Sequence, residues 1–452
     1  MRGIQKSFIA LLLLSLTHYT SAVNFTSYFS KAPVQVLNET DSQGIFSDPF
    51  LVPTGSDSTI AIFGMNSDDN NFNFSRRIVD SSTFAQIGND SQLDFSIFSE
   101  EIPFVAASPS GMVAVASDDR LNLTNEIFIS FFPANYVDEN TSNVTTLQMT
   151  FNTDPTVDYQ FAQFFYLNGY FYILYTACSE KNTSENYIYL QGISESNHNV
   201  TQFESPLQLT VNDSVAERNP FARCGQHGTY QKLLCMWKRV SKNSTVSVEV
   251  DLINKQVSAE TELAHDSNEW YYRPLEVVNY DKHCAHLIAV SDNANVSSQT
   301  DFLSMKVKVS FLSQVYALPY SLPSDMQEYT YVGAGAYYGG WYVLNNQYYA
   351  DPDTSEPRSS VGVNIYQKDG SMNGTQHIIA YNGTASGLLT RGGSVYVLVK
   401  NSSQNFGNDW DVAYLGQLYS STSYPPQQPK FAAKIALPYL SLIIVIITFY
   451  II

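Results

Sequence analysis

The chain offers few side chains whose spacing could support a reaction. Asp48 lies within Phe46–Phe50, and Glu217 begins the similar segment Glu217–Phe221. Glycoside hydrolysis uses two carboxyl groups placed on either side of the scissile bond. Asp48 is therefore a candidate for one of them, with Glu217 or Glu269 as the second. No G-x-S-x-G, H-E-x-x-H, P-loop or kinase motif is present.

The segment around Asp48 is similar to the Asp-Pro pattern near the start of the first blade in five-bladed propeller glycosidases. That resemblance implies an extracellular carbohydrate-active enzyme as one alternative function. However, a Pro-Phe-like pair recurs at Pro49, Pro103, Pro220 and Pro274, where it precedes an apolar run. The recurrence favours a structural role in opening strands, so no residue is assigned as catalytic.

Candidate metal ligands are incomplete, and we predict neither a metal nor another cofactor. In the segment His283–His286, alternate residues of a strand would face opposite sides, which separates His283 from Cys284. Asp68 and Asp69, and the pair Asp351 and Asp353, do not complete a calcium loop. We interpret these acidic residues as solvated turns.

Aromatic residues beside turns give a stronger basis for a binding function. Tyrosine and tryptophan combine a large apolar surface with a polar tip, which suits sugar faces and protein hot spots. The residues predicted to bind are the aromatic ones of two clusters: Trp270, Tyr271, Tyr272, Tyr337, Tyr338 and Trp341.

The two ends of the chain predict export and membrane attachment. Residues 1–22 have the cationic start, apolar run and small-residue cleavage site of a signal peptide. Residues 421–434 supply small residues and a polar spacer, with Ser421 as the attachment site, and residues 435–452 are apolar. This order is typical of a glycosylphosphatidylinositol (GPI) signal, the alternative being a C-terminal transmembrane helix. Residues 23–420 would form the ectodomain, on the outer leaflet of the plasma membrane.

Charge and glycosylation motifs fit that location. Loss of both terminal segments would leave 20 basic and 42 acidic residues, a net charge of −22, which argues against a nucleic-acid partner. N-glycans require exposed positions. The chain has fifteen N-x-S/T motifs, at Asn24, Asn38, Asn73, Asn89, Asn122, Asn140, Asn143, Asn182, Asn199, Asn212, Asn243, Asn295, Asn373, Asn382 and Asn401.

Four cysteines are expected to form two disulfides in an oxidising compartment. Cys224 and Cys235 flank a glycine-containing segment, Gly225–Gly228, which predicts a turn. A local hairpin bridge between these two cysteines is therefore expected. That pairing leaves Cys178 with Cys284.

The ectodomain consists of repeated short strands. Seven apolar, β-rich runs recur about 55 residues apart, each with further strand candidates on both sides. These runs are Thr59–Phe63, Met112–Ala116, Tyr170–Tyr175, Lys232–Trp237, His286–Val290, Trp341–Leu344 and Ser394–Val399. The pattern predicts an all-β fold, a β-propeller of seven blades, because packing such sheets around an axis buries their faces. Tandem β-sandwich domains are the alternative.

The last repeat is short, and the N-terminal segment could complete it. Val34–Leu37 precedes the first full repeat, and we predict that it pairs into the last blade and closes the ring. The Gly-Gly starts at Gly339–Leu344 and Gly392–Leu398 resemble those of kelch-type propellers. Only two repeats carry them, so the sequence is assigned to no family.

These patterns together predict a GPI-anchored, glycosylated cell-surface propeller that acts as a binding module. Its ligand would be a glycan or a cell-surface protein. The alternatives are the carbohydrate-active enzyme considered above and a surface coat protein without catalytic activity.

Overall fold

The structure is a computed structural model. It describes residues 23–38, 49–68, 71–99, 103–119, 126–135, 144–149, 157–179, 186–196, 199–210, 222–226, 232–239, 244–263, 270–279, 284–293, 300–308, 326–337, 340–350, 357–367, 377–401 and 412–419. Every regular element in these segments is a β-strand. None of the described residues belongs to a helix that could span a membrane.

The described strands form seven sheets, each a meander of antiparallel strands. Sheet one contains β3 (Phe50–Pro53), β4 (Thr59–Asp68), β5 (Asn71–Asp80) and β6 (Ser91–Phe98). Sheet two contains β7 (Phe104–Ala107), β8 (Met112–Asp119), β9 (Glu126–Pro133) and β10 (Thr145–Met149). Sheet three contains β11 (Val157–Leu167), β12 (Tyr170–Ser179), β13 (Asn186–Ser196), β14 (Asn199–Phe203) and β15 (Leu207–Gln208).

The later sheets follow the same plan. Sheet four contains β16 (Arg223–Gln226), β17 (Lys232–Arg239), β18 (Ser244–Asp251), β19 (Gln256–Val257) and β20 (Thr261–Leu263). Sheet five contains β21 (Trp270–Asn279), β22 (Cys284–Asn293) and β23 (Thr300–Lys308). Sheet six contains β24 (Met326–Tyr337), β25 (Gly340–Ala350), β26 (Pro357–Gln367), β27 (His377–Tyr381) and β1 (Asn24–Phe25). Sheet seven contains β28 (Gly383–Arg391), β29 (Ser394–Asn401), β30 (Ala413–Tyr419) and β2 (Lys31–Leu37).

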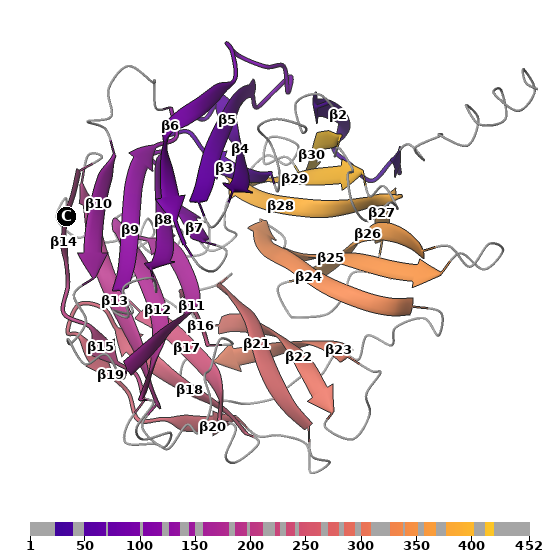
Figure 1. Ribbon diagram of the computed structural model, residues 1–452. Helices are drawn as coiled ribbons and strands as arrows, with labels where there is room; N and C mark the ends of the chain where they lie inside the picture. The colour runs from indigo at the N-terminus through magenta and orange to yellow at the C-terminus, as the bar shows by residue number, and fades with distance from the viewer. Residues whose placement is uncertain are drawn as a thin grey trace, which may run out of the picture.

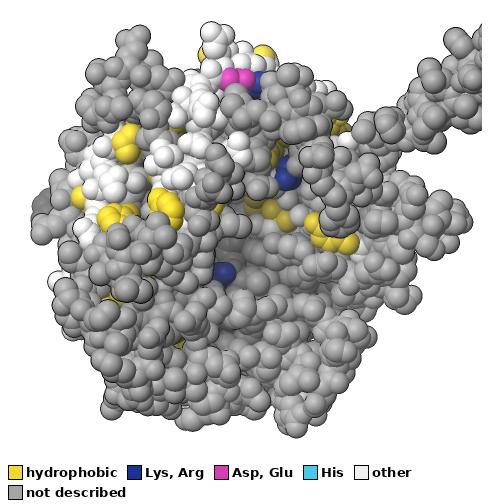
Figure 2. Space-filling model, in the orientation of Figure 1, with side chains coloured by type: hydrophobic (Ala, Val, Ile, Leu, Met, Phe, Trp, Pro, Cys, Tyr) yellow, Lys and Arg dark blue, Asp and Glu magenta, His cyan; other side chains and the backbone are white. Residues whose placement is uncertain are grey.

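The sheets follow one another in chain order around a common centre (Figure 1). The first strand of each repeat contacts the first strand of a neighbouring sheet, as in β7 with β11, β16 with β21 and β24 with β28. β28 of sheet seven in turn contacts β3 of sheet one, so the last sheet meets the first. The predicted all-β propeller fold is thus confirmed. A hollow lies at the centre of the face in view in Figure 2.

Hydrophobic clusters lie between consecutive sheets. One cluster joins sheets two and three, and another joins sheets three and four. β12 contributes to both because its side chains alternate: Phe171 and Ile173 pack in the first, while Tyr172 and Leu174 pack in the second. Further clusters join sheets one and two, six and seven, and seven and one. Sheets one, two, three and seven therefore bury both faces against their neighbours, and sheets four and six each bury one face in a described cluster.

The seven apolar runs found in the sequence occupy equivalent positions in the fold. Each lies in the second strand of its sheet, namely β4, β8, β12, β17, β22, β25 and β29. This strand has neighbours on both sides within its sheet and adjacent sheets on both faces. The sequence period was visible because the centre of this strand is apolar on both faces.

The N-terminal segment completes the last sheet, as predicted. Val34 of β2 pairs with Leu415 of β30, at the outer edge of sheet seven. Leu37 is fully buried, whereas Val34 is 41% exposed, so β2 contributes to the core mainly through its C-terminal end. Just before it, β1 pairs with β27 at the outer edge of sheet six.

Two buried arginines connect sheet one with the elements around it. The guanidinium of Arg77 donates to both carboxylate oxygens of Asp90, at 2.8 and 2.5 Å, and also to the carbonyl oxygen of Val36 in β2. Arg76 donates to the carbonyl oxygen of Ala134, 3.2 Å away, next to sheet two. Sheet one is thereby linked to the closing strand and to the following sheet.

The predicted bridge between Cys224 and Cys235 is present, with the two residues directly opposite each other on β16 and β17. Gly225, which was predicted to lie in the turn, instead pairs with Leu234 within the strands. The side chains of Cys178 and Cys284 lie outside the described residues, so their pairing stays a prediction. Their strands, β12 and β22, belong to sheets three and five.

Candidate binding site

The six aromatic residues predicted to bind are divided between two places in the fold. Trp270–Tyr272 begin β21, whereas Tyr337 ends β24 and Trp341 lies near the start of β25. The first strands of neighbouring repeats run in the same direction, so the start of β21 and the end of β24 lie at opposite ends of the ring. The structure does not unite these residues in one site. Tyr338 lies outside the described residues, as do the side chains of the other five.

Most other predicted site residues cannot be placed. Asp48, Glu217, Glu269, His283, Asp351, Asp353 and Ser421 lie outside the described residues, as do the side chains of Asp68 and Cys284. Among the residues whose side chains are described, no three of His, Cys, Asp and Glu form a group that could hold a metal ion.

The described glycosylation motifs differ in exposure. Asn24, Asn38 and Asn89 are exposed, and Asn73 and Asn382 are half-buried. Asn401 is only 9% exposed. Because a glycan needs an accessible amide, the fold favours modification at the first three and disfavours it at Asn401. Glycosylation of all of them stays a prediction.

One end of the ring is built by the turns between the first and second strands of the sheets, and we call it the inner-turn face. Its described turns are 54–58, 108–111, 168–169 and 392–393. The turns of sheets one and two lie against each other at Gly55 and Gly111, where a Cβ on either residue would come within 2.6 Å of the neighbouring backbone. Both glycines also have positive φ angles, of 83° and 91°. These positions require glycine, and the face is compact there.

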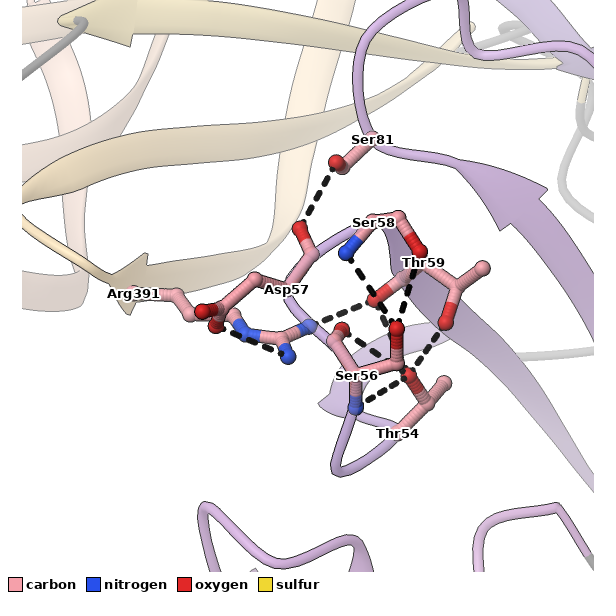
Figure 3. Close-up of polar contacts among 7 residues, drawn as sticks. All are labelled: Thr54, Ser56, Asp57, Ser58, Thr59, Ser81 and Arg391. Atoms are coloured by element: carbon pink, nitrogen blue, oxygen red, sulfur yellow. Dashed lines mark hydrogen bonds and ion pairs between the residues drawn. The ribbon is translucent and has the colours of Figure 1, made fainter. Parts of the chain in front are cut away.

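Hydroxyl groups and one arginine organise this face where sheet seven meets sheet one (Figure 3). The Oγ1 atom of Thr54 lies 2.5 Å from that of Thr59 and accepts a hydrogen bond from the backbone N–H of Ser56. Arg391, at the end of β28, donates to the carbonyl oxygen of Thr59 at 2.5 Å and pairs with Asp57 at 3.3 Å. The Asp57 side chain is fully exposed. The seven residues of this cluster include no histidine. Their contacts stabilise the junction between sheets seven and one and present a polar surface.

A groove of about 570 Å³ opens on the same face between sheets three and four. Sheet three contributes Asn168 and Tyr170 at its first turn, together with Tyr172 of β12 and Glu204 after β14. The turn between β18 and β19 contributes the opposite side of the groove, which consists of Leu252, Ile253 and Lys255.

An aromatic stack forms the sheet-three wall of the groove. The ring of Tyr172 stacks on Phe165 at 5.6 Å and on Tyr170 at 5.8 Å, measured between centroids. Tyr172 is 3% exposed, while Tyr170 is half-buried. Burial raises the pKa of the Tyr172 phenol, and the negative charge of Glu204 raises it further. The phenol therefore keeps its proton throughout the physiological range.

A carboxylate and an ammonium group meet across the groove. Lys255 forms an ion pair with Glu204, and its Nζ atom lies 5.9 Å from the centre of the Tyr170 ring. The Lys255 and Glu204 side chains are 41% and 28% exposed. Both groups can therefore reach a ligand while they remain paired with each other.

Backbone contacts hold these side chains in place. Glu204 is fixed by its backbone N–H, which donates to Gly192, and by its carbonyl oxygen, which accepts from Gln191, each at 2.8 Å. A Cβ at Gly192 would lie 2.8 Å from a Glu204 carboxylate oxygen and 3.1 Å from the Tyr172 ring. The Asp251 carboxylate caps the turn that carries Lys255 by accepting from the N–H groups of Ile253 and Asn254, each at 3.0 Å.

Sequence reasoning did not identify this groove. Tyr170 and Tyr172 belong to the third apolar run, in which Tyr172 is buried. The adjacent turn at Asn168 and Gly169 was the available signal that Tyr170 lies at a surface. Nothing in the sequence links Glu204 to Lys255, since the ring geometry brings them together.

The chain is similar to known proteins in the course of its backbone. No family model matches it, and no curated protein is similar to it in sequence. Solved structures with a similar course include prolyl endopeptidases, at 9% identity and a TM-score of 0.46, over 82% of this chain. The chain spans 48% of the length of those enzymes.

Two further similar structures are described as propellers. The β-propeller domain of the Trilobed protease from Pyrococcus furiosus has 8% identity and a TM-score of 0.42, over 82% of this chain and 98% of that one. The Dos1 propeller has 8% identity and a TM-score of 0.41, over 86% and 96%. The assignment of this chain to the β-propellers rests on its own ring of sheets.

Proposed function

We propose that the chain is an N-glycosylated binding module held at the outer cell surface by a GPI anchor, and that it engages its ligand through the inner-turn face. The anchor proposal follows from the order of small residues, polar spacer and apolar tail in 421–452. The binding proposal rests on the placement of the glycosylation motifs relative to the described strands.

The connections between first and second strands carry no N-x-S/T motif in any of the seven sheets. The connections between second and third strands, at the opposite end of the ring, carry one in each of sheets two to five: Asn122, Asn182, Asn243 and Asn295. Glycans on these residues would cover the opposite end. This asymmetry is the observation that carries the proposal.

The inner-turn end of the ring also carries N-x-S/T motifs, but these lie in the connections between third and fourth strands. Asn89 lies between β5 and β6, Asn140 and Asn143 lie between β9 and β10, Asn199 begins β14, and Asn373 lies between β26 and β27. These connections are further from the centre of the ring than the first turns. Glycans there would surround the centre of the inner-turn face and leave it accessible to a ligand.

A glycan placed on this face tests the proposal. Asp57→Asn creates an N-x-S/T motif that is completed by Thr59, at a fully exposed position, and Asp57→Gln removes the same charge without creating a motif. The full-length variants would be compared on an array of oligosaccharides and cell-surface ectodomains. We expect the glycosylated variant to lose at least tenfold in affinity while the glutamine variant retains it. Equal binding by a fully glycosylated Asp57→Asn protein would refute the proposed face.

The anchor has a separate test. Phosphatidylinositol-specific phospholipase should release the protein from intact cells, and deletion of residues 435–452 should cause its secretion. A C-terminal tag that remains on the mature, membrane-bound chain would instead identify a spanning helix.

A further inference from the structure

We propose that the groove between sheets three and four is a subsite for a neutral saccharide, with Tyr170 as the stacking platform. This inference rests on the proposed binding function and gives it a ligand class. The groove volume of about 570 Å³ lies within the range of roughly 300–1,000 Å³ that is usual for ligand sites. It therefore has room for one or two sugar rings.

The aromatic wall provides the contact that a sugar ring needs. Tyr170 is half-buried and lines the groove, and its ring is supported from within the sheet by Tyr172. Tyr172 is in turn stacked on Phe165. A ring held in this way loses little conformational freedom when the C–H face of a sugar packs against it.

The charged pair favours a neutral ligand over an ion. Glu204 and Lys255 cancel each other's charge, so the site offers no net attraction to an anion or a cation. It does offer an acceptor and a donor side by side. Adjacent hydroxyl groups of a sugar can donate to the carboxylate and accept from the ammonium at the same time. Asn168 adds an amide at the same rim.

The opposite wall is apolar. Ile253 is 59% exposed, and Leu252 beside it also lines the groove. An aliphatic side chain opposite an aromatic platform suits a ligand that has C–H groups on its ring faces and hydroxyls around its edge. A sugar ring has this distribution.

The experiment uses the full-length protein, purified from membranes in detergent, on an array of neutral, sialylated and sulfated oligosaccharides. We expect binding to at least one neutral oligosaccharide. Tyr170→Ala should weaken it at least tenfold, Tyr170→Phe should remain within threefold because the ring face is retained, and Glu204→Gln should weaken it. Tyr381→Ala, at an exposed tyrosine on β27, is the matched control and should bind as wild type. Thermal unfolding of each variant would verify its fold.

Three results would overturn the inference: no neutral oligosaccharide bound above the Tyr170→Ala background, binding of charged oligosaccharides alone, or equal binding by wild type and Tyr170→Ala. The proposed function would survive any of them if Asp57→Asn still blocked a cell-surface protein on the ectodomain array. If the Tyr170 variants lost binding but the Asp57→Asn glycan had no effect, the saccharide site would stand without the wider face.

Discussion

The junction between sheets seven and one and the junction between sheets three and four differ at the inner-turn face. Where sheet seven meets sheet one, charged groups supplement a hydrophobic cluster: Arg391 binds the turn at Asp57 and Thr59, and Arg77 binds Asp90 and the closing strand. Sheets three and four also share a hydrophobic cluster, and the Arg223 guanidinium and the Cys224 N–H of β16 donate to Ala162 and Gln163 of β11. At its edge a groove remains, with one ion pair across it.

The difference reflects how each junction is made. Closing the ring requires an N-terminal strand to find a C-terminal sheet, and directional hydrogen bonds specify that register. Sheets three and four follow each other in the chain, so their junction needs no charged contact between the turns of the inner-turn face. The consecutive junction can therefore leave a ligand site open, whereas the closing junction is occupied by its own contacts.

Removal of the closing strand should have the largest effect. A chain whose mature part begins at Ser42 lacks β1 and β2, which exposes the β30 edge and the cluster that contains Leu37. We expect failure of secretion or a melting temperature lower by several degrees. A chain that begins at Ser30 keeps β2 and is the control. Normal secretion and melting of the shorter chain would show that closure does not depend on β2.

The next largest effect is expected at Arg77. Arg77→Met would leave Asp90, whose side chain is 19% exposed, without its bidentate partner, and would free the Val36 carbonyl. Loss of one member of a buried pair costs about 3–5 kcal/mol, and the partial exposure of Asp90 places the expected loss near the lower value. Denaturant unfolding measures it. Asp90→Asn keeps a hydrogen-bond acceptor for Arg77 and should lower the free energy of unfolding by less than Arg77→Met. An equal loss in the two variants would argue against a stabilising Arg77–Asp90 pair.

Removal of the Cys224–Cys235 disulfide, in sheet four beside the groove, should lower the stability by an amount comparable to that of Arg77→Met. The double variant Cys224→Ala, Cys235→Ala opens a loop of short span, and loop-closure entropy predicts a loss of about 3 kcal/mol. Non-reducing peptide mapping should find these two cysteines joined. Unchanged stability after reduction would show that sheet four does not depend on the bridge.

The smallest effect concerns acid stability near the closing junction. Hydrogen bonds from the Ser82 hydroxyl and from Thr83 lower the pKa of Asp80 from 3.8 to about 2. This contribution is fully present above pH 3.8 and is lost as the pH falls through about 2. Asp80→Asn should therefore remove a small part of the difference in melting temperature between about pH 5 and about pH 2. An identical difference in the variant would show that the cap contributes nothing.

The sequence predicted the ring better than the site, for a physical reason. Second strands such as β12 are apolar on both faces, so the repeat of about 55 residues was visible in the sequence. Val34–Leu37 lies before the first repeat, and the short last repeat lacked a strand that it could supply. Glu204 and Lys255 are distant in sequence and meet only because consecutive sheets lie side by side. Tyr170 and Tyr172 share a residue type and a strand, and only their distance from the turn separates a surface platform from core.

A glycan at the edge of the groove tests the account most directly. Gln256→Thr completes an N-x-T motif that begins at the exposed Asn254, and Gln256→Val is its isosteric control without a motif. The affinity of both full-length variants for the ligand bound by wild type is the measurement. We predict that glycosylated Gln256→Thr binds at least tenfold more weakly than Gln256→Val. Equal affinities, with Asn254 shown to be glycosylated, would contradict the assignment of the inner-turn face as the binding face.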